Sequence, residues 1–506
     1  MELREATASE PAHPQRLTAK LWLFSCIFCS VFIAYGTTEI LQSSLYATSG
    51  YICLFAVYAA FLLSSLLAPL LVHRIGPIAT LWRCGLFYML SVLINALGPT
   101  APPALRLLMC ACVGLAGGGF WSAQALYVSL LAQALAAASG ATPSAALSSL
   151  TSKFFVVFSS AQVLSQLLAS AILLGFGADR VGSAVSALFS LLTALAACGT
   201  LVLSRLEAPN APSARVLRAL GSKLWDAGAQ PALPPASAAD PEAAAAPNGA
   251  AATSSATAAT AATAATAATA ATAATAATAA TAGLPPPTPY QVYLFLASQP
   301  ALQATLPMLF YGGGSLGFVL GPFLGSFAQE RIGLGPIGFV AATFNIVSLS
   351  CALPIDFCVR RPSCGRRWVF VAGTALHLAW LVAASALLWV SSEGSGSGSS
   401  FQTPSAYALV FGAIAINGAA APIFQSQLPA LLQSWYLTPR DSTCAIAVYR
   451  VAFSAGFMAA QGLSIGYLQA TGLPHLAEQC AIWAGVLACS GALLAWLHAS
   501  GQRRIE

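Results

Sequence analysis

The chain has 506 residues, of which 58% are hydrophobic and only 7% are charged, and its formal net charge is +6. A chain of this length and composition cannot stay dispersed in water, which excludes a soluble globular protein and predicts a membrane protein with lipid-facing helices. The modest positive charge gives no sign of a nucleic-acid partner.

The first half of the chain contains six apolar runs. A helix needs roughly 20 apolar residues to cross a bilayer. The polar segment 1–20 lacks the apolar core and small-residue cleavage site of a secretory signal, so we expect the first run to stay in the mature protein. We expect membrane-spanning helices within residues 21–204, at 21–41, 50–72, 79–98, 104–131, 151–176 and 183–204.

A long segment of different composition, residues 205–289, separates the halves. It begins with Arg205, Arg215, Arg218 and Lys223 and continues into a strict Thr-Ala-Ala repeat from Thr257 to Thr281. A period of three does not match the 3.6 residues of a helical turn, and no apolar stripe is available to bury. The segment is predicted to be a tether that is disordered or a frayed helix, with a specific binding role as the alternative.

The second half, residues 290–498, repeats the pattern before a short tail at 499–506. Its apolar runs lie at 303–327, 333–353, 367–391, 405–431, 442–468 and 476–498. The sequence therefore predicts an all-α membrane protein with twelve transmembrane helices, arranged as two six-helix halves.

The basic residues indicate the orientation, because cytoplasmic loops of membrane proteins are enriched in Lys and Arg. With the N-terminus inside, most of the 21 basic residues fall in cytoplasmic segments; the exceptions are Arg106, Arg180, Arg331 and Arg450. Both termini and the tether are therefore predicted to be cytoplasmic, in the plasma membrane or an endomembrane.

A short motif occurs once in each half. Trp121-Ser122-Ala123-Gln124 in the fourth run corresponds to Phe424-Gln425-Ser426-Gln427 in the tenth, and small residues precede both. Six plus six spans joined by a long basic loop resemble the major facilitator superfamily. The resemblance implies two parallel repeats around a midplane cavity.

Further short motifs follow one another in order through both halves. They include Ala34-Tyr35-Gly36, Leu41-Gln42-Ser43-Ser44-Leu45, Ile75-Gly76-Pro77, Leu306-Pro307, Tyr311, His377-Leu378 and Tyr449-Arg450. In this set the chain is similar to the ion-channel regulatory, UNC-ninety-three-like family. The resemblance implies a regulator or escort of another membrane protein, such as a potassium channel or a trafficked receptor.

Acidic residues are missing where the resemblance would place them. Related proteins tend to have an acid at the positions of Pro322 and Ala421, and the loop Pro69-x-x-x-His73-Arg74-x-Gly76 also lacks one. An acid-poor interior disfavours proton-coupled transport. The alternative function is a secondary transporter that moves a small solute by alternating access, which the twelve-span repeat favours.

Two ionisable side chains fall inside predicted spans, where such residues are costly and usually functional. Arg450 is either a site residue or a structural arginine, with Gln425, Gln427, backbone carbonyls and cavity water as expected acceptors. Glu39 lies near the outer end of its span, which favours an interfacial carboxylate. A depth difference of roughly 15 Å argues against a direct pair between the two.

Uncharged polar residues complete the candidate site. Gln124 and Gln427 are expected to face the bundle interior, where they either line a cavity or hydrogen-bond between helices. The resemblance adds Gln42, Trp121 and Tyr311 as cavity, substrate or partner residues. His377 has no partner at ligand spacing, so an interior histidine is favoured over a metal ligand.

Two glycine triplets, Gly117–Gly119 and Gly312–Gly314, allow neighbouring helices to approach closely, or allow a broken helix at a midplane site. No nucleophile–base set, phosphate-binding loop or zinc spacing occurs in the sequence. We therefore expect no enzyme activity, no metal and no cofactor, and the lipid bilayer as the first partner.

Overall fold

The computed structural model describes residues 14–140, 143–176, 180–206, 287–360, 365–393, 404–436, 439–471 and 475–500. Every regular element in these ranges is helical. Ten of the helices there are long and apolar enough to cross a membrane. The helical membrane protein predicted from composition is confirmed, whereas the Thr-Ala-Ala repeat and both chain ends lie outside the described ranges.

The helices of the first half coincide closely with the predicted apolar runs. They are α1 (Pro14–Ile75), α2 (Pro77–Ala96), the short η1 (Gly98–Thr100), α3 (Pro103–Ser139), α4 (Pro143–Phe176) and α5 (Val181–Leu203). Proline is the first residue of four of them, where its missing N–H costs nothing and its fixed φ suits a helix start. Proline residues thus mark most of the helix starts in the first half.

The first helix, α1, is bent once, at Ala47, whose φ of 47° and ψ of −127° are non-helical. Its apolar segment of 59 residues would extend roughly 90 Å if straight, about three times the thickness of the hydrocarbon core. The two arms lie side by side, because Tyr58 on the second arm hydrogen-bonds Glu39 on the first. The predicted runs 21–41 and 50–72 are these two arms.

The helices of the second half also match their predicted runs. They are α8 (Pro289–Ser298), α9 (Pro300–Phe318), η3 (Val319–Ala328), α10 (Gln329–Ile332), α11 (Ile337–Arg360), α12 (Gly365–Glu393), α13 (Pro404–Pro422), η4 (Ile423–Gln427), α14 (Leu428–Trp435), α15 (Pro439–Thr471) and α16 (Leu476–Ala499). Thr288 and Gln291 form a capping box at the start of α8.

Two of these helices change to π-helical geometry in their middle. Between α9 and α10 the segment η3 contains Pro322, and η4 follows directly after Pro422. Proline removes a backbone hydrogen bond and clashes with the preceding turn, so the helix widens there. Continuous apolar segments nevertheless run from Pro300 to Ile332 and from Pro404 to Leu432.

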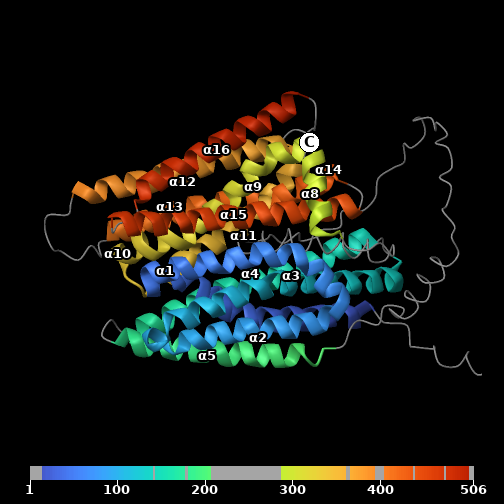
Figure 1. Ribbon diagram of the computed structural model, residues 1–506, viewed down its shortest axis with the longest axis horizontal. Helices are drawn as coiled ribbons and strands as arrows, with labels where there is room; N and C mark the ends of the chain where they lie inside the picture. Colours follow the sequence, from blue (N-terminus) through green and yellow to red (C-terminus); the bar gives the residue numbers. More distant parts are fainter. Residues whose placement is uncertain are drawn as a thin grey trace, which may run out of the picture.

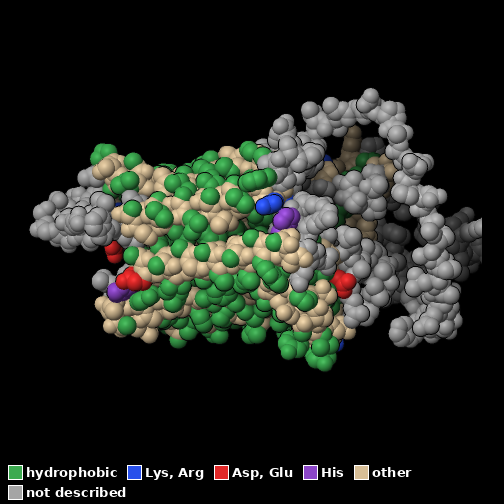
Figure 2. All heavy atoms as spheres, turned by 90° about the horizontal axis from the view of Figure 1, so that it is seen from above, with side chains coloured by type: hydrophobic (Ala, Val, Ile, Leu, Met, Phe, Trp, Pro, Cys, Tyr) green, Lys and Arg blue, Asp and Glu red, His purple; other side chains and the backbone are tan. Residues whose placement is uncertain are grey.

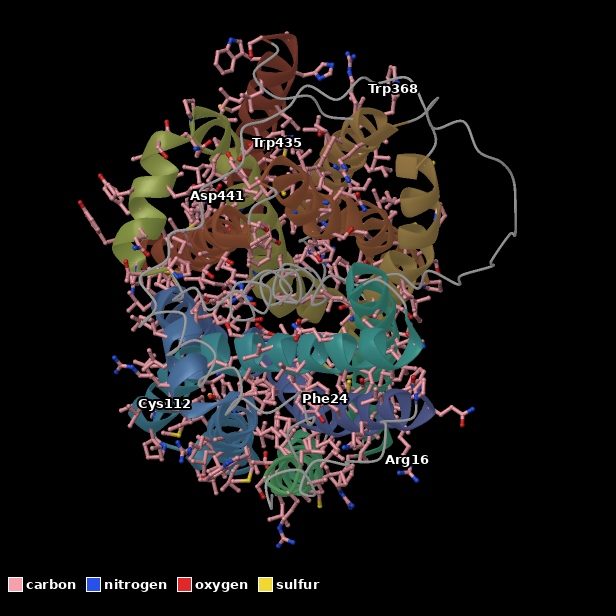
Figure 3. All side chains as sticks on the ribbon, turned by 90° about the vertical axis from the view of Figure 1, so that its right-hand side faces the viewer. Arg16, Phe24, Cys112, Trp368, Trp435 and Asp441 are labelled. Carbon is pink, nitrogen blue, oxygen red and sulfur yellow. The ribbon has the colours of Figure 1, made fainter. Side chains whose placement is uncertain are left out.

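The two halves lie side by side along one contact layer (Figure 1; Figure 3). Across this layer α1 packs on α15 and η3, and α4 packs on α11. One hydrophobic cluster continues from the first half into the second, and a separate aromatic cluster around the fully buried Phe24 and Phe28 fills the first half. Figure 3 shows Phe24 inside the first half and Arg16 at its edge.

The end of α5, the helix α8 and the end of α16 lie at the same end of the bundle in Figure 1, which we call the linker end. Since successive helices are joined by short connections and reverse direction, the bend at Ala47 lies at the opposite end, the far end. The outer face in Figure 2 is covered by hydrophobic side chains with few charges between them. Elsewhere on the described helices, Leu67, Leu164 and Val382 are each more than half exposed, as expected of residues that contact lipid.

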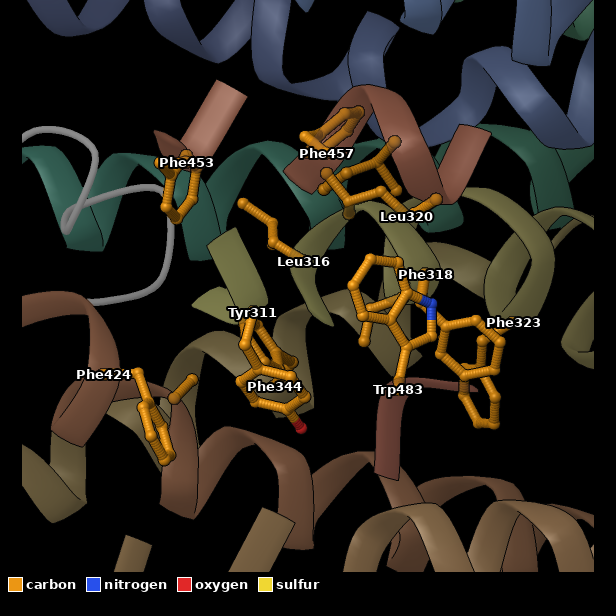
Figure 4. Packing of buried hydrophobic residues seen from close by; sticks show 14 of the residues in the cluster. Tyr311, Leu316, Phe318, Leu320, Phe323, Phe344, Phe424, Phe453, Phe457 and Trp483 are labelled. Atoms are coloured by element: carbon orange, nitrogen blue, oxygen red, sulfur yellow. The ribbon is translucent and has the colours of Figure 1, made fainter. Parts of the chain in front are cut away.

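The glycine triplets lie at close helix contacts, which confirms the first of the two interpretations offered for them. A Cβ added at Gly118 would lie 2.5 Å from the hydroxyl oxygen of Ser64, and one added at Gly313 would lie 1.7 Å from the carbonyl oxygen of Phe453. Figure 4 shows the aromatic packing around the second contact, with Tyr311, Phe453 and Trp483. Small residues let membrane helices approach at van der Waals distance.

Candidate functional site

A cavity of about 100 Å³ lies between the two halves, which is room for several water molecules. Its two sides differ in chemistry. The first half contributes mainly aromatic rings, from Phe32, Tyr35, Tyr58, Phe61, Tyr88 and Trp121. The second half contributes mainly aliphatic side chains, from Leu316, Val319, Leu320, Leu324 and Ile414, together with Phe344. Leu316 and Leu320 lie on the side of the second half that faces α1 (Figure 4).

Glu39 lines this cavity, so it differs from the interfacial carboxylate that the sequence favours. Its Oε1 accepts a hydrogen bond of 2.8 Å from the hydroxyl of Tyr58. The ring of Tyr58 is stacked on Phe457 of α15, with ring centroids 3.5 Å apart. The carboxylate is therefore held by the second arm of α1, and that arm in turn contacts the second half.

The aromatic rings beside Glu39 form a continuous wall. Phe32 and Trp121 have centroids 4.5 Å apart, Phe32 and Tyr88 5.6 Å, and Tyr35 and Tyr88 4.8 Å in an edge-on arrangement. These separations are typical of attractive ring pairs. Phe32, Tyr35 and Glu39 follow one another at spacings of three and four residues, so one face of α1 presents both the rings and the carboxylate.

Arg450 is 3% exposed and lies on α15 at the contact with the first half. Its Nη1 donates to the hydroxyl oxygen of Ser122 on α3 at 3.3 Å, and its Nε and Nη2 have no hydrogen-bond partner among the described residues. Of the candidate acceptors that the sequence offered, Gln425 and Gln427 do not accept from it in the described structure. The Gln425 Oε1 makes no hydrogen bond within the described structure, and the amide of Gln427 bonds the hydroxyl of Ser426.

The remaining candidates do not line the cavity. Gln42 donates to the Cys110 sulfur at 3.6 Å, and the Oε1 of the buried Gln124 has no partner among the described residues. Tyr311 is completely buried, and its hydroxyl lies 2.8 Å from Nδ1 of His377. His377 is thus an interior histidine with a hydrogen-bond partner. Of the seven candidates, Glu39 and Trp121 line the cavity, whereas Arg450 is not among the lining residues and bonds Ser122, the neighbour of Trp121 in the chain.

Polar bonds between the halves cluster near the far end, and the sequence did not reveal them. Ser43 donates to the carbonyl oxygen of Leu320 at 2.8 Å, and the hydroxyls of Tyr51 and Ser326 are 2.6 Å apart. On the other side of the cavity the backbone N–H of Phe339 donates to Ser170 at 3.0 Å. These bonds hold the two halves together at the far end.

Gln162 is a further cavity residue that the sequence reasoning missed. It belongs to a polar stripe on α4 with Ser159, Gln166 and Ser170, at spacings of three and four residues, and all four are buried or nearly so. A Cβ at Gly36 would lie 2.5 Å from the Gln162 Oε1, so α1 and α4 meet there. Helical periodicity of polar residues in an apolar run was the available signal.

No group of three or more His, Cys, Asp or Glu side chains that could hold a metal ion occurs within the described ranges. The polar groups at the cavity are the Glu39 carboxylate, tyrosine hydroxyls and the side-chain amides of Gln162 and Asn345. Such a set suits reversible binding by charge and hydrogen bonds.

The fold is similar to that of two solved transporters. The structure is similar to a nucleoside transporter, NupG, with a TM-score of 0.58 and 13% identity, covering 95% of this chain and 98% of that chain. It is also similar to an auto-inhibited peptide transporter of the POT family, with a TM-score of 0.55 and 14% identity over 97% and 98% of the two chains. Identities this low establish the fold alone.

Among proteins of known sequence, the chain resembles protein unc-93 homolog A from Bos taurus. The two are 34% identical over 148 residues, and the match covers 28% of this chain and 31% of that protein. No family model matches the sequence. The resemblance to the unc-93-like proteins that the motifs predict is thereby confirmed, over somewhat less than a third of the relative's length.

Proposed function

We propose that this protein regulates or escorts another membrane protein, such as a potassium channel, and does not transport a solute. The proposal rests on the scarcity of acidic side chains at the cavity. Glu39 is the one carboxylate among the cavity residues, and it is already bonded to Tyr58. Ion-coupled transporters use ionisable side chains at the midplane to bind and release the coupling ion.

Arg450 supports the same proposal. In ion and proton pathways, charged residues inside the membrane commonly pair with one another. Here its described hydrogen bond goes to the neutral hydroxyl of Ser122. The bond joins α15 to α3, so its role in this proposal is to fix the position of one half against the other.

The proposed architecture has twelve membrane crossings in two six-helix halves, 21–204 and 290–498, with a cytoplasmic tether at 205–289. The bent α1 counts as two crossings, since each arm is roughly 40 to 50 Å long and the hydrocarbon core is about 30 Å thick. The placement of Lys and Arg supports cytoplasmic tails at 1–20 and 499–506.

The nature of the partner rests on the unc-93-like resemblance, which implies a membrane protein. The site residues proposed for this role are Glu39, Trp121 and Arg450 at the contact between the halves. Gln42 and Tyr311 are proposed to position helices through their hydrogen bonds to Cys110 and His377. Gln124 and Gln427 are proposed as further polar residues inside the bundle. A binding and positioning role needs no catalytic group, so the proposed function is non-enzymatic.

Two measurements on the full chain test the proposal. The first is solute uptake by the purified protein in liposomes, across a panel that includes nucleosides and peptides, with a nucleoside transporter as the positive control. The second is whole-cell potassium current with and without co-expression of the chain. Altered current without solute uptake is the expected result. Saturable uptake of any solute would overturn the proposal in favour of the transporter.

A further inference from the structure

The cavity between the halves combines one carboxylate with a wall of aromatic rings. Glu39 is partly exposed, and its exposed part faces this space. Oε1 of Glu39 accepts from Tyr58, while no hydrogen bond of Oε2 is present among the described residues. Tyr35, Tyr88 and Trp121 line the same space from α1, α2 and α3. Negative charge and π faces together attract a cation.

We propose that this cavity binds a compact organic ammonium ion, with Glu39 as its counter-charge and the rings of Tyr35, Tyr88 and Trp121 around its head. The inference goes beyond the proposed regulatory function and does not depend on it. If the protein transports no solute, the ammonium ion is a regulatory ligand. If the protein is a transporter, the ion is its substrate.

The residues that line the cavity disfavour an anionic ligand. The residues that line the cavity include no Lys, Arg or His, so an anion would meet only the like charge of Glu39. Arg450 is not among the lining residues, and its described hydrogen bond goes to Ser122, so it does not neutralise the carboxylate at the cavity surface. A buried carboxylate without a cation is costly, and a bound ammonium ion removes that cost.

The opposite wall indicates that the ion is organic. Leu316, Val319, Leu320 and Ile414 cover the side contributed by the second half, where hydrocarbon is favoured and a hydrated metal ion is not. The volume of about 100 Å³ limits the ligand to a small head group with a short apolar part. The side-chain amides of Gln162 and Asn345 lie at the edge for one further polar contact.

Gly36 keeps this site open. A Cβ at that position would lie 2.5 Å from Oε1 and 3.1 Å from Nε2 of Gln162, so alanine there would push the amide out of its place. Gly36 lies between Tyr35 and Glu39 on the face of α1 that lines the cavity. Its size therefore contributes to the shape of the pocket.

The test is equilibrium binding to the purified full chain in lipid nanodiscs, followed by the fluorescence of tryptophan, because Trp121 lines the cavity, and by thermal stability. The probes are choline and its uncharged carbon isostere, 3,3-dimethyl-1-butanol. They have nearly the same shape and differ in charge. We expect saturable binding of choline and an affinity for the isostere that is weaker by about tenfold or more. Equal affinities, or no saturable binding of choline, would overturn the proposal.

The matched variants are Glu39→Gln and Glu478→Gln. The first keeps an acceptor for Tyr58 and removes the charge, so choline should bind about tenfold more weakly or worse. The second removes a carboxylate at the start of α16, outside the cavity, and should leave the affinity unchanged. If Glu39→Gln does not yield folded protein, Trp121→Leu is expected to weaken choline binding several-fold. Retained affinity in that variant would contradict the proposed contact between the ammonium head and the aromatic rings. Failure of the regulatory role would appear instead in the uptake and current measurements.

Discussion

Two neighbouring glycines of α9 offer a sharp test of the packing between α9 and α15. A Cβ at Gly313 would lie 1.7 Å from the carbonyl oxygen and 2.6 Å from the carbonyl carbon of Phe453, which are backbone atoms. A Cβ at Gly312 would lie 3.7 Å from the ring of Phe453, an ordinary contact. Alanine is therefore accommodated at Gly312, whereas at Gly313 it requires the facing helix to shift.

The magnitude follows from the displacement. Real Cβ contacts are essentially never shorter than 3.0 Å, so Gly313→Ala requires α15 to move by at least 1.3 Å, the difference between 3.0 and 1.7 Å. A gap of 0.5–1 Å already forfeits a quarter to a half of each van der Waals contact across the interface. We expect a destabilisation of about 3 kcal/mol, at the upper end of overpacking costs because backbone cannot rotate away. Gly312→Ala should be neutral or stabilise by up to about 1 kcal/mol.

The assay is thermal unfolding of the two purified variants in the same detergent, alongside the wild type. Gly313→Ala should melt several degrees below Gly312→Ala. A reciprocal test is available on the facing helix, where a Cβ at Gly456 would lie 1.8 Å from the carbonyl oxygen of Phe310. Gly313 and Gly456 both belong to the contact between α9 and α15. The double alanine variant should therefore lose less stability than the sum of the losses in the two single variants. Equal melting temperatures for the 312 and 313 variants would refute this account of the interface.

Four further predictions concern the site and the topology. Arg450→Lys should impair activity per folded molecule at the surface, since the single ammonium charge of lysine cannot replace the planar guanidinium and its N–H donors. Arg450→Ala should impair activity without loss of membrane insertion. Wild-type activity in the alanine variant would remove Arg450 from the site. A cysteine placed within 205–289, in a background without native cysteines, should be labelled only from the cytoplasmic side. Deletion of 257–281 should leave surface level and function unchanged, and loss of surface expression would show that the repeat is recognised. A cysteine at Gln124 should be inert to small aqueous reagents, whereas one at Trp121 should react.

The positions of the helices were predictable from the sequence because lipid imposes a simple requirement, a long apolar run for every crossing. Proline and glycine at the run boundaries then fix the ends, as at Pro77 and Pro103. The π-helical geometry of 319–328 was not predictable. Pro322 indicates a disturbed helix, but whether the turn tightens, kinks or widens depends on what packs against it.

The partners of the site residues were harder to predict. Counting residues along a helix gives depth, and on that ground the sequence argued against a direct pair of Glu39 and Arg450; in the structure Glu39 bonds Tyr58 and Arg450 bonds Ser122. Depth does not say which helix lies opposite. Arg450 contacts Ser122 on α3, in the first half. The sequence instead suggested acceptors in the tenth apolar run, in the same half as Arg450. Contacts between the halves depend on how two separate bundles dock, and no local pattern encodes that docking.

The two occurrences of the shared motif have different surroundings, and this difference argues for a division of roles between the halves. Trp121 in the first half lines the cavity, whereas Phe424 at the corresponding position of the second half is buried against Tyr311 and His377. The first half also supplies Glu39, and the second supplies the aliphatic wall. Substitutions in the first half should therefore change which ligand binds, and substitutions at the aliphatic wall should change how tightly the halves close around it. A cavity made equally by both repeats would respond in the same way to changes on either side.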